Sequence, residues 1–246
     1  MEKDRPPLPR PEPSVLTKSM EACIGNGERI LEDAMWLEMQ EPPSTKLMLS
    51  MIAQEEFAKA FLLFLVKEEV VPWSRELLRA MNDHACKQLV GVIIDYLHPE
   101  WETLDDLRKL CDIDFELGDR LPPKVASAVN ILRHEKIGRW EANNWFWVDD
   151  PDYEPSILRI SKGKRDAVKQ DALYVRLGQD GRVTSMPLRT TQARAEEEFE
   201  RANSYGRFVS SLLNNGAPKS ISYEKLRDAL RALFSVGSEP SSEASF

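Results

Sequence analysis

The chain has 246 residues, of which 42% are hydrophobic and 30% are charged, and its formal net charge is −8. This length can bury a sizeable core. The composition excludes a mainly disordered chain, which would have fewer apolar residues, and an integral membrane protein, which would have fewer charges. The net negative charge argues against non-specific binding to nucleic acid, because proteins that bind through phosphate contacts usually carry an excess of basic residues. Any contact with nucleic acid is therefore expected to be local.

The N-terminal sequence lacks the positively charged start and apolar run of a signal peptide or membrane anchor. We therefore expect a soluble, cytoplasmic protein with no membrane partner. Three widely spaced cysteines, Cys23, Cys86 and Cys111, form no CxxC pair, which argues against a disulfide framework or a zinc site. They are expected to be buried thiols in a reducing compartment, and no cofactor is expected.

The first half of the chain predicts long helices. Five prolines within residues 1–13 indicate a disordered arm. Apolar residues at helical spacing predict a helix from 15 to about 40 and, after a Pro-Pro pair, a second over 44–69 that is apolar on nearly every side. A third helix is expected over 74–97. Short breaks between long helices favour antiparallel neighbours in a bundle.

The second half is more varied. The segments 172–177 and 181–186 flank Gly178-Gln-Asp-Gly181, which has the residues of a hairpin turn, so we expect a small strand pair packed on the bundle. The other elements expected are helices over 104–111, 124–147, 191–213 and 223–234 and a disordered tail over 235–246. The predicted fold class is mainly α, with a helical core over 14–155 and, over 156–234, a β-hairpin plus C-terminal helices packed on that core.

Charge in the segment 159–194 departs from the acidic average. Nine basic residues stand against three acidic ones, which gives a local balance of +6. Contacts with RNA phosphates are a hypothesis for four of them: Lys162, Lys164, Arg165 and Lys169. A solvated surface, balanced by the acidic remainder of the chain, is the alternative.

The second predicted helix contains three charged residues, Glu55, Glu56 and Lys59, within an otherwise apolar stretch. A buried unpaired charge is strongly unfavourable, so these side chains need partners. Lys59 can close one ion pair within the helix, and the other carboxylate must reach solvent or a neighbouring helix. His84 and Lys87, one turn apart on the third predicted helix, are the natural candidates.

Arg79 and His84 form an Arg-x-x-x-x-His pattern on that helix. A histidine with a pKa near neutrality can accept the proton of a ribose 2′-hydroxyl, and an arginine can hold the phosphate and stabilise its developing charge, without a metal. The alternative is a solvated arginine and a polar interhelical histidine. A metal site is not proposed, because Glu55 and Glu56 point about 100° apart on a helix and no second histidine stands at ligand spacing.

Arg133-His134-Glu135-Lys136 is a second polar cluster, which together with Arg139 and Trp140 could bind phosphate or stack on a base. An ordinary surface helix is the simpler interpretation. The sequence contains no Gly-rich phosphate loop, no Ser-His-Asp order and no zinc-finger spacing, which removes the commonest enzyme classes.

Three features together resemble a known family. Ser50-Met-Ile-Ala-Gln-Glu-Glu-Phe-Ala-Lys59 is similar to the Glu-Glu-x-x-Lys core of the AbiV abortive infection proteins, although Ala58 stands where that family often has glycine. Asp83-His84-x-x-Lys87 and Ala172-Leu-Tyr-Val175, with a turn and Pro187, resemble its downstream features. The resemblance runs in order from Val15 to Pro187 and does not extend to the tail.

The resemblance implies a HEPN-like helical bundle, since AbiV proteins are grouped with that superfamily. Its members commonly form homodimers and place an Arg-x(4 to 6)-His motif in a composite cleft, where many cleave RNA without a metal. For this chain it implies Arg79 and His84 as catalytic residues, with Glu55, Glu56, Lys59 and Lys87 as a supporting polar cluster. It also implies an RNA substrate and a phage-encoded activator or antitoxin-like partner.

Two functions follow as hypotheses. The first is an anti-phage abortive infection effector that arrests growth or translation of the infected cell by metal-independent RNA cleavage. The second is a non-catalytic helical interaction protein that binds a translation component or a phage protein, with the charged cluster only satisfying a polar core. The effect of His84→Ala on a folded protein separates them.

Overall fold

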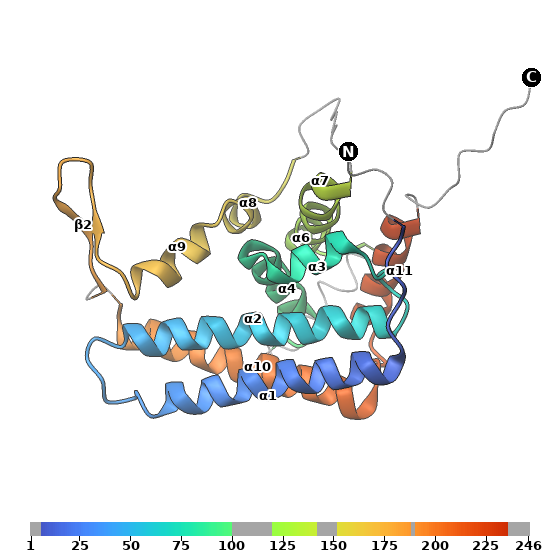
Figure 1. The fold of residues 1–246 in the computed structure, drawn as a ribbon, viewed down its shortest axis with the longest axis horizontal. Coiled ribbons are helices and arrows are strands. Elements are labelled where there is room, and N and C mark those ends of the chain that lie inside the picture. The colour runs from blue at the N-terminus through green and yellow to red at the C-terminus, as the bar shows by residue number, and fades with distance from the viewer. Residues whose placement is uncertain (1–5, 100–119, 142–151, 188–189, 236–246) are drawn as a thin grey trace, which may run out of the picture.

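A computed structural model of the chain describes residues 6–99, 120–141, 152–187 and 190–235 (Figure 1). The fold is mainly α with one small two-stranded hairpin, as predicted from the sequence. The helix expected over 104–111 and the tail expected over 235–246 fall outside the described residues, except for the first residue of the tail. In the described residues, no helix combines the length and the apolar character needed to span a bilayer.

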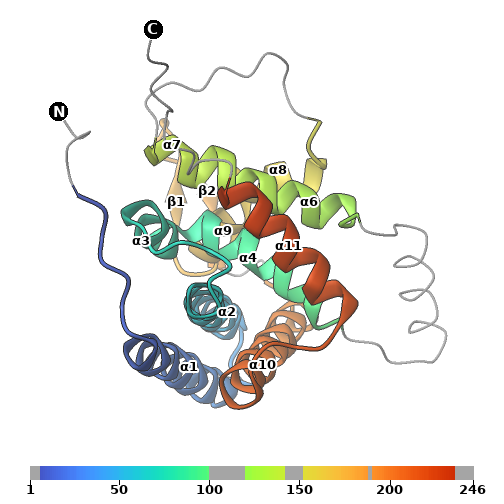
Figure 2. The same cartoon turned by 90° about the vertical axis from the view of Figure 1, so that its right-hand side faces the viewer.

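Three long helices, α1 (Pro13–Met35), α2 (Ser44–Lys67) and α10 (Gln192–Asn215), run side by side along the molecule (Figures 1 and 2). α2 is buried on nearly every side, as its apolar sequence predicts. Phe57 lies at the centre of this packing and is fully buried. A Cβ added at Gly27 of α1 would lie 2.5 Å from its ring, and one added at Gly206 of α10 would lie 3.0 Å from it. Two glycines therefore let both helices approach α2 closely.

Above α2 lie α4 (His84–Leu97) and α11 (Ile221–Ser235), and above these lie α6 (Pro123–Asn130), the π-helix η1 (Ile131–Ile137) and α7 (Gly138–Glu141) (Figure 2). The single helix expected over 124–147 is thus an α-helix that widens into a π-helix and then narrows again. Its last expected residues fall outside the described part of the chain.

The prediction of one helix over 74–97 was wrong at its middle. The chain forms α3 (Arg75–Asn82), turns at Asp83, and begins α4 at His84. Asp83 has an extended backbone, with φ −84° and ψ 125°, and its side chain accepts a hydrogen bond from Cys86 N at 2.8 Å. This is the geometry of a helix N-cap, for which aspartate is among the best residues.

Two short helices precede the hairpin and were not predicted: α8 (Pro155–Ser161) and α9 (Lys164–Asp171). Gly163 joins them with φ 75°, a left-handed conformation that glycine adopts without steric cost. The hairpin follows at the expected place with shorter strands, β1 (Arg176–Leu177) paired antiparallel with β2 (Val183–Ser185). In Figure 1 the hairpin projects beyond the helices at one end.

The described part of the arm, from residue 6, lies against the opposite end of the molecule. Arg75 donates a hydrogen bond to the Pro6 carbonyl at 2.9 Å. Arg10 pairs with Glu69 and donates to the carbonyls of Val66 at 3.1 Å and Lys67 at 3.0 Å. These contacts attach the arm to the end of α2 and the start of α3.

Candidate functional site

The turn between α3 and α4 places His84 at the first residue of α4. Both helices of this corner begin with a side-chain cap. Ser74 accepts from Leu77 N at 3.0 Å, and Asp83 accepts from Cys86 N. Such caps satisfy backbone donors that a helix start leaves free, so they fix where each helix begins. The His84 side chain is consequently held at a defined corner, with 52% of its surface exposed.

Glu55, in the middle of α2, is the centre of the polar cluster at this corner. Its carboxylate is 3% exposed and lies 2.6 Å from His84 Nδ1, 2.9 Å from Lys87 Nζ and 2.8 Å from Lys169 Nζ. The two partners expected from the sequence, His84 and Lys87, both contact it. Lys169 arrives from α9, 114 residues away in the chain, and was not anticipated as a partner. Three separate helices, α2, α4 and α9, therefore meet at one carboxylate.

The charge state of Glu55 decides which nitrogen of His84 carries a proton. Burial alone would raise the pKa of this carboxyl, but the hydrogen bond from Lys169 and the charge of Lys87 outweigh it and hold the pKa below its usual value. An ionised carboxylate can only accept hydrogen bonds, so the 2.6 Å contact favours the tautomer with a proton on His84 Nδ1 over the one in which Nδ1 accepts from Lys169 Nζ, which lies 3.0 Å away. In the neutral imidazole the proton-free nitrogen is then Nε2. This arrangement leaves Nε2 able to act as a base.

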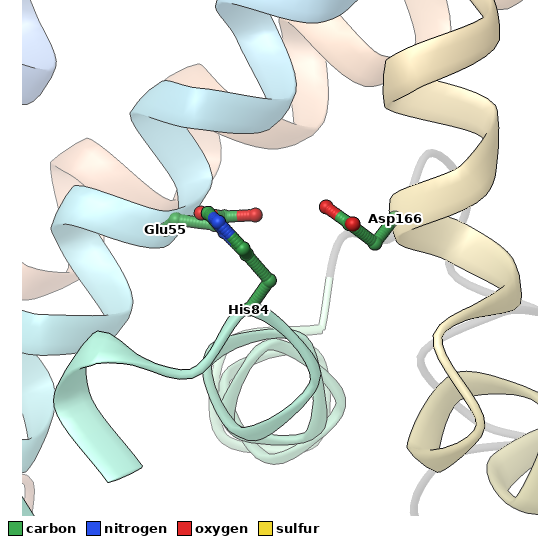
Figure 3. A group of neighbouring side chains, drawn as sticks. All are labelled: Glu55, His84 and Asp166. Carbon is green, nitrogen blue, oxygen red and sulfur yellow. The ribbon is translucent and has the colours of Figure 1, made fainter. Parts of the chain in front are cut away.

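Asp166 of α9 completes the group (Figure 3). Within the described residues, Glu55, His84 and Asp166 offer one ligand atom each within 4.8 Å of one another, a set that could hold a metal ion. However, the Lys169 ammonium lies 2.8 Å from Glu55 Oε1, 2.8 Å from Asp166 Oδ1 and 3.0 Å from His84 Nδ1. A side-chain cation thus stands among the three ligand atoms, and a metal ion would have to displace it.

Two members of the expected supporting cluster lie elsewhere. Glu56 and Lys59 pair with each other within α2 at 2.6 Å, the intrahelical ion pair that the spacing predicts. Burial raises the thiol pKa of Cys23 in α1, and the charges of Glu56 and Lys59 lie close enough to affect the same thiol. The ion pair therefore lies on the side of α2 that faces α1. The adjacent glutamates point in different directions, and only Glu55 reaches His84.

Arg79 lies in the last turn of α3, exposed, and its backbone carbonyl accepts a hydrogen bond from Asp83 N at 3.0 Å. Arg79 and His84 therefore stand on either side of one corner rather than on one continuous helix. On one continuous helix the five-residue spacing would be about one and a half turns, but the bend at Asp83 interrupts it.

The four candidate RNA contacts divide into two pairs. Arg165 donates to Glu198 at 2.6 Å and to Gln54 at 2.9 Å, so it ties α9 to α10 and α2. Lys169 is buried in the Glu55 cluster. Lys162 and Lys164, on either side of Gly163, are exposed. Of the four, the structure leaves Lys162 and Lys164 at the surface and engages Arg165 and Lys169 with carboxylates.

In a comparison with known protein families, the family described as AbiV, of HEPN type, matches residues 15–207. The matched region contains every residue of the Glu55 cluster. Comparisons with curated proteins and with solved structures gave no match.

Proposed function

Because the chain belongs to the AbiV family, whose members act in abortive infection, we propose that it is an anti-phage effector that arrests infected cells by metal-independent RNA cleavage at His84. One observation carries the chemical part of the proposal. His84 donates through Nδ1 to the buried Glu55 carboxylate at 2.6 Å and is itself half exposed, so its other ring nitrogen is oriented as a base.

The proposed reaction is an intramolecular transesterification. Nε2 of His84 takes the proton of a ribose 2′-hydroxyl, the 2′ oxygen attacks the adjacent phosphorus, and the bond to the 5′ oxygen breaks. The 5′ oxygen leaves with a proton from water, and the products are a 2′,3′-cyclic phosphate and a 5′-hydroxyl end. Glu55 acts as a positioning residue, since it holds the imidazole in one tautomer and orientation, as carboxylates do for catalytic histidines.

In this proposal, Arg79 supplies the positive charge that binds the phosphate. Its guanidinium can hold two phosphate oxygens at once and offset the charge that develops on them. Lys162 and Lys164, exposed at the turn between α8 and α9, are proposed to contact phosphates further along the RNA. Lys87 and Lys169 serve the site indirectly, because both are engaged with Glu55.

A homodimer and a phage-encoded activator or antitoxin-like partner belong to the same proposal. In a homodimer two corners of this kind would form a composite cleft. An effector that arrests its own cell also needs to be silent before infection, which a partner or trigger would provide.

The experiment that tests the proposal is cleavage of total cellular RNA by the purified protein in the presence of EDTA. His84→Ala is compared with wild type and with His98→Gln, a control at the far end of α4, where His98 stacks on Phe208. We expect discrete fragments that end in 2′,3′-cyclic phosphate from wild type and His98→Gln, and none from His84→Ala. Matched melting temperatures ensure that lost cleavage is not lost folding.

Growth arrest in phage-infected cells provides the parallel readout, because an activator is present there. The rival function is a non-catalytic interaction protein, and the full engagement of Glu55 with His84, Lys87 and Lys169 favours it, since those contacts also suit a purely structural cluster. If folded His84→Ala still arrests infected cells as strongly as wild type, catalysis at His84 is refuted and the binding function replaces it.

A further inference from the structure

A cavity of about 830 Å³ lies at the end of the molecule away from the hairpin, where the arm, the end of α2, η1 and α11 come together. Its size is within the range of pockets that bind small organic ligands, roughly 300–1,000 Å³. The residues that give it chemical character are Arg10, Glu69, Trp73, Arg133 and Phe234, joined by Glu141 and Arg231. The cluster at His84 contributes none of the described residues that line it.

Two of the residues that line this cavity lie in segments with unusual backbone geometry. Glu69 has φ 57°, and among the described residues it is the one residue other than glycine with positive φ. It follows the end of α2, where the bonds from Glu69 N to Val66 O and from Val70 N to Leu65 O form the usual helix-ending motif with glutamate in place of glycine. A non-glycine residue in this conformation is strained, and such strain concentrates at functional sites.

The second departure is the π-helix η1, which contains Arg133. π-helical turns are rare and occur frequently at functional sites. Arg133 is buried, with its Nε donating to the Leu233 carbonyl at 3.3 Å and its Nη1 to Glu141 at 2.6 Å. Its guanidinium also lies over the Phe234 ring, 4.8 Å from the centroid. The cavity therefore has a wall in which a guanidinium and an aromatic ring are held in fixed positions.

The charged groups at the cavity point to an anionic ligand. Three guanidiniums, those of Arg10, Arg133 and Arg231, face two carboxylates, those of Glu69 and Glu141, among the described lining residues. Each guanidinium has five N–H donors. Carboxylates and backbone carbonyls of the described residues take three donor contacts of Arg10, two of Arg133 and one of Arg231, so each guanidinium keeps donors for a ligand. Guanidiniums in this number are suited to phosphate oxygens.

The aromatic residues indicate what else the ligand carries. Trp73 and Phe234 are half-buried at the cavity and present planar apolar surface next to the guanidiniums. A base stacked on an aromatic ring gains about 1–3 kcal/mol, and a phosphate beside it is held by arginine. We propose that this cavity is a nucleotide-binding site, in which the arginines hold the phosphates and the base lies against the aromatic side chains.

This site is separate from the one at His84. Trp73 precedes Ser74, the N-cap of α3, and His84 follows Asp83 at its other end, so the eight residues of α3, about 12 Å of helix, lie between them. Arg10, Arg231 and Phe234 also fall outside the region that matches the AbiV family. The proposal does not depend on RNA cleavage, and binding can be measured on protein that has no activity.

The test is calorimetric titration of the full chain with ATP and with GTP, beside inorganic triphosphate and the two nucleosides as partial ligands. At least one nucleotide is expected to bind at least tenfold more tightly than triphosphate or its nucleoside. The double variant Arg10→Gln and Arg231→Gln is expected to weaken that binding about tenfold or more. Arg29→Gln, which removes an exposed arginine paired with Asp33 in α1, is the matched control and should leave it unchanged.

A second variant changes the affinity in the opposite direction. Glu69→Gly removes a carboxylate from Arg10 and places glycine at a position with positive φ, so the fold is retained and binding should tighten about threefold or more. The proposal is overturned if neither nucleotide binds at millimolar concentration. It is equally overturned if triphosphate alone binds as well, or if the double arginine variant binds like wild type.

Discussion

Replacing Glu55 with glutamine tests the central physical claim about the site, that one buried carboxylate holds three helices together. The Lys87 and Lys169 side chains are 8% and 9% exposed, and both point at this carboxylate. Glu55→Gln leaves the buried Lys87 ammonium without the carboxylate that it contacts, and leaves Lys169 with Asp166 alone. Breaking a buried ion pair from one side typically costs about 3–5 kcal/mol, so a loss of this size in the free energy of unfolding is expected.

The neighbouring glutamate is a control of the same type on the same helix. Glu56 pairs with Lys59, but these side chains are 14% and 26% exposed, so solvent screens the interaction. Glu56→Gln is expected to cost about 1 kcal/mol or less. Urea unfolding followed by circular dichroism measures both variants, with the slope of each transition checked for constancy. Equal losses for the two variants would refute the view that Glu55 is the buried centre.

Three further predictions concern stability and accessibility. The pKa of Glu55 is lowered from 4.5, so the ionised carboxylate stabilises the folded protein above that pH, and this contribution is lost as pH falls through the folded-state pKa. Urea midpoints measured from about pH 6 to pH 3 should therefore fall more steeply for wild type than for Glu55→Gln. Gly27→Ala should destabilise the folded protein by about 1–3 kcal/mol, because its Cβ would lie 2.5 Å from the Phe57 ring. Gly25→Ala has open space around the new Cβ and should stabilise α1 by up to about 1 kcal/mol. Thermal melts compare the two variants. Burial raises the pKa of the Cys86 thiol, so a thiol reagent should label it only after unfolding, and peptide mass spectrometry of native protein that shows rapid labelling would contradict its placement.

The sequence predicted much of this arrangement where burial could be inferred from pattern. α2 is apolar on nearly every side, so its charged residues had to be paired, and the spacing identified Lys59 as the partner of one glutamate within the helix. His84 and Lys87 were expected at the other glutamate because they stand one turn apart on a neighbouring helix, and both contact Glu55. Charge on an apolar helix is a strong signal, since an unpaired buried ion is so costly.

The contribution of α9 could not be predicted in the same way. Its sequence has no apolar stripe, and the residue it buries is Lys169, a lysine that looks like surface charge in a basic segment. Nothing in local spacing connects a residue to a carboxylate 114 positions earlier. The break at Asp83 is different, because Asn82-Asp83 provides the residue types of a cap. The apolar pattern continues on both sides of it and therefore predicts one helix.

The position of Lys169 has a consequence for how the site can meet RNA. Glu55 and Asp166 supply two negative charges, and Lys87 and Lys169 supply two positive ones, so the four groups cancel. With a neutral imidazole on His84 the cluster therefore has no net charge to attract a phosphate. For the RNA cleavage proposed above, the strand would therefore have to be held by charge from outside the cluster. The candidates are Arg79 at the end of α3 and the exposed lysines beside Gly163, or the same groups of a second copy in the proposed homodimer.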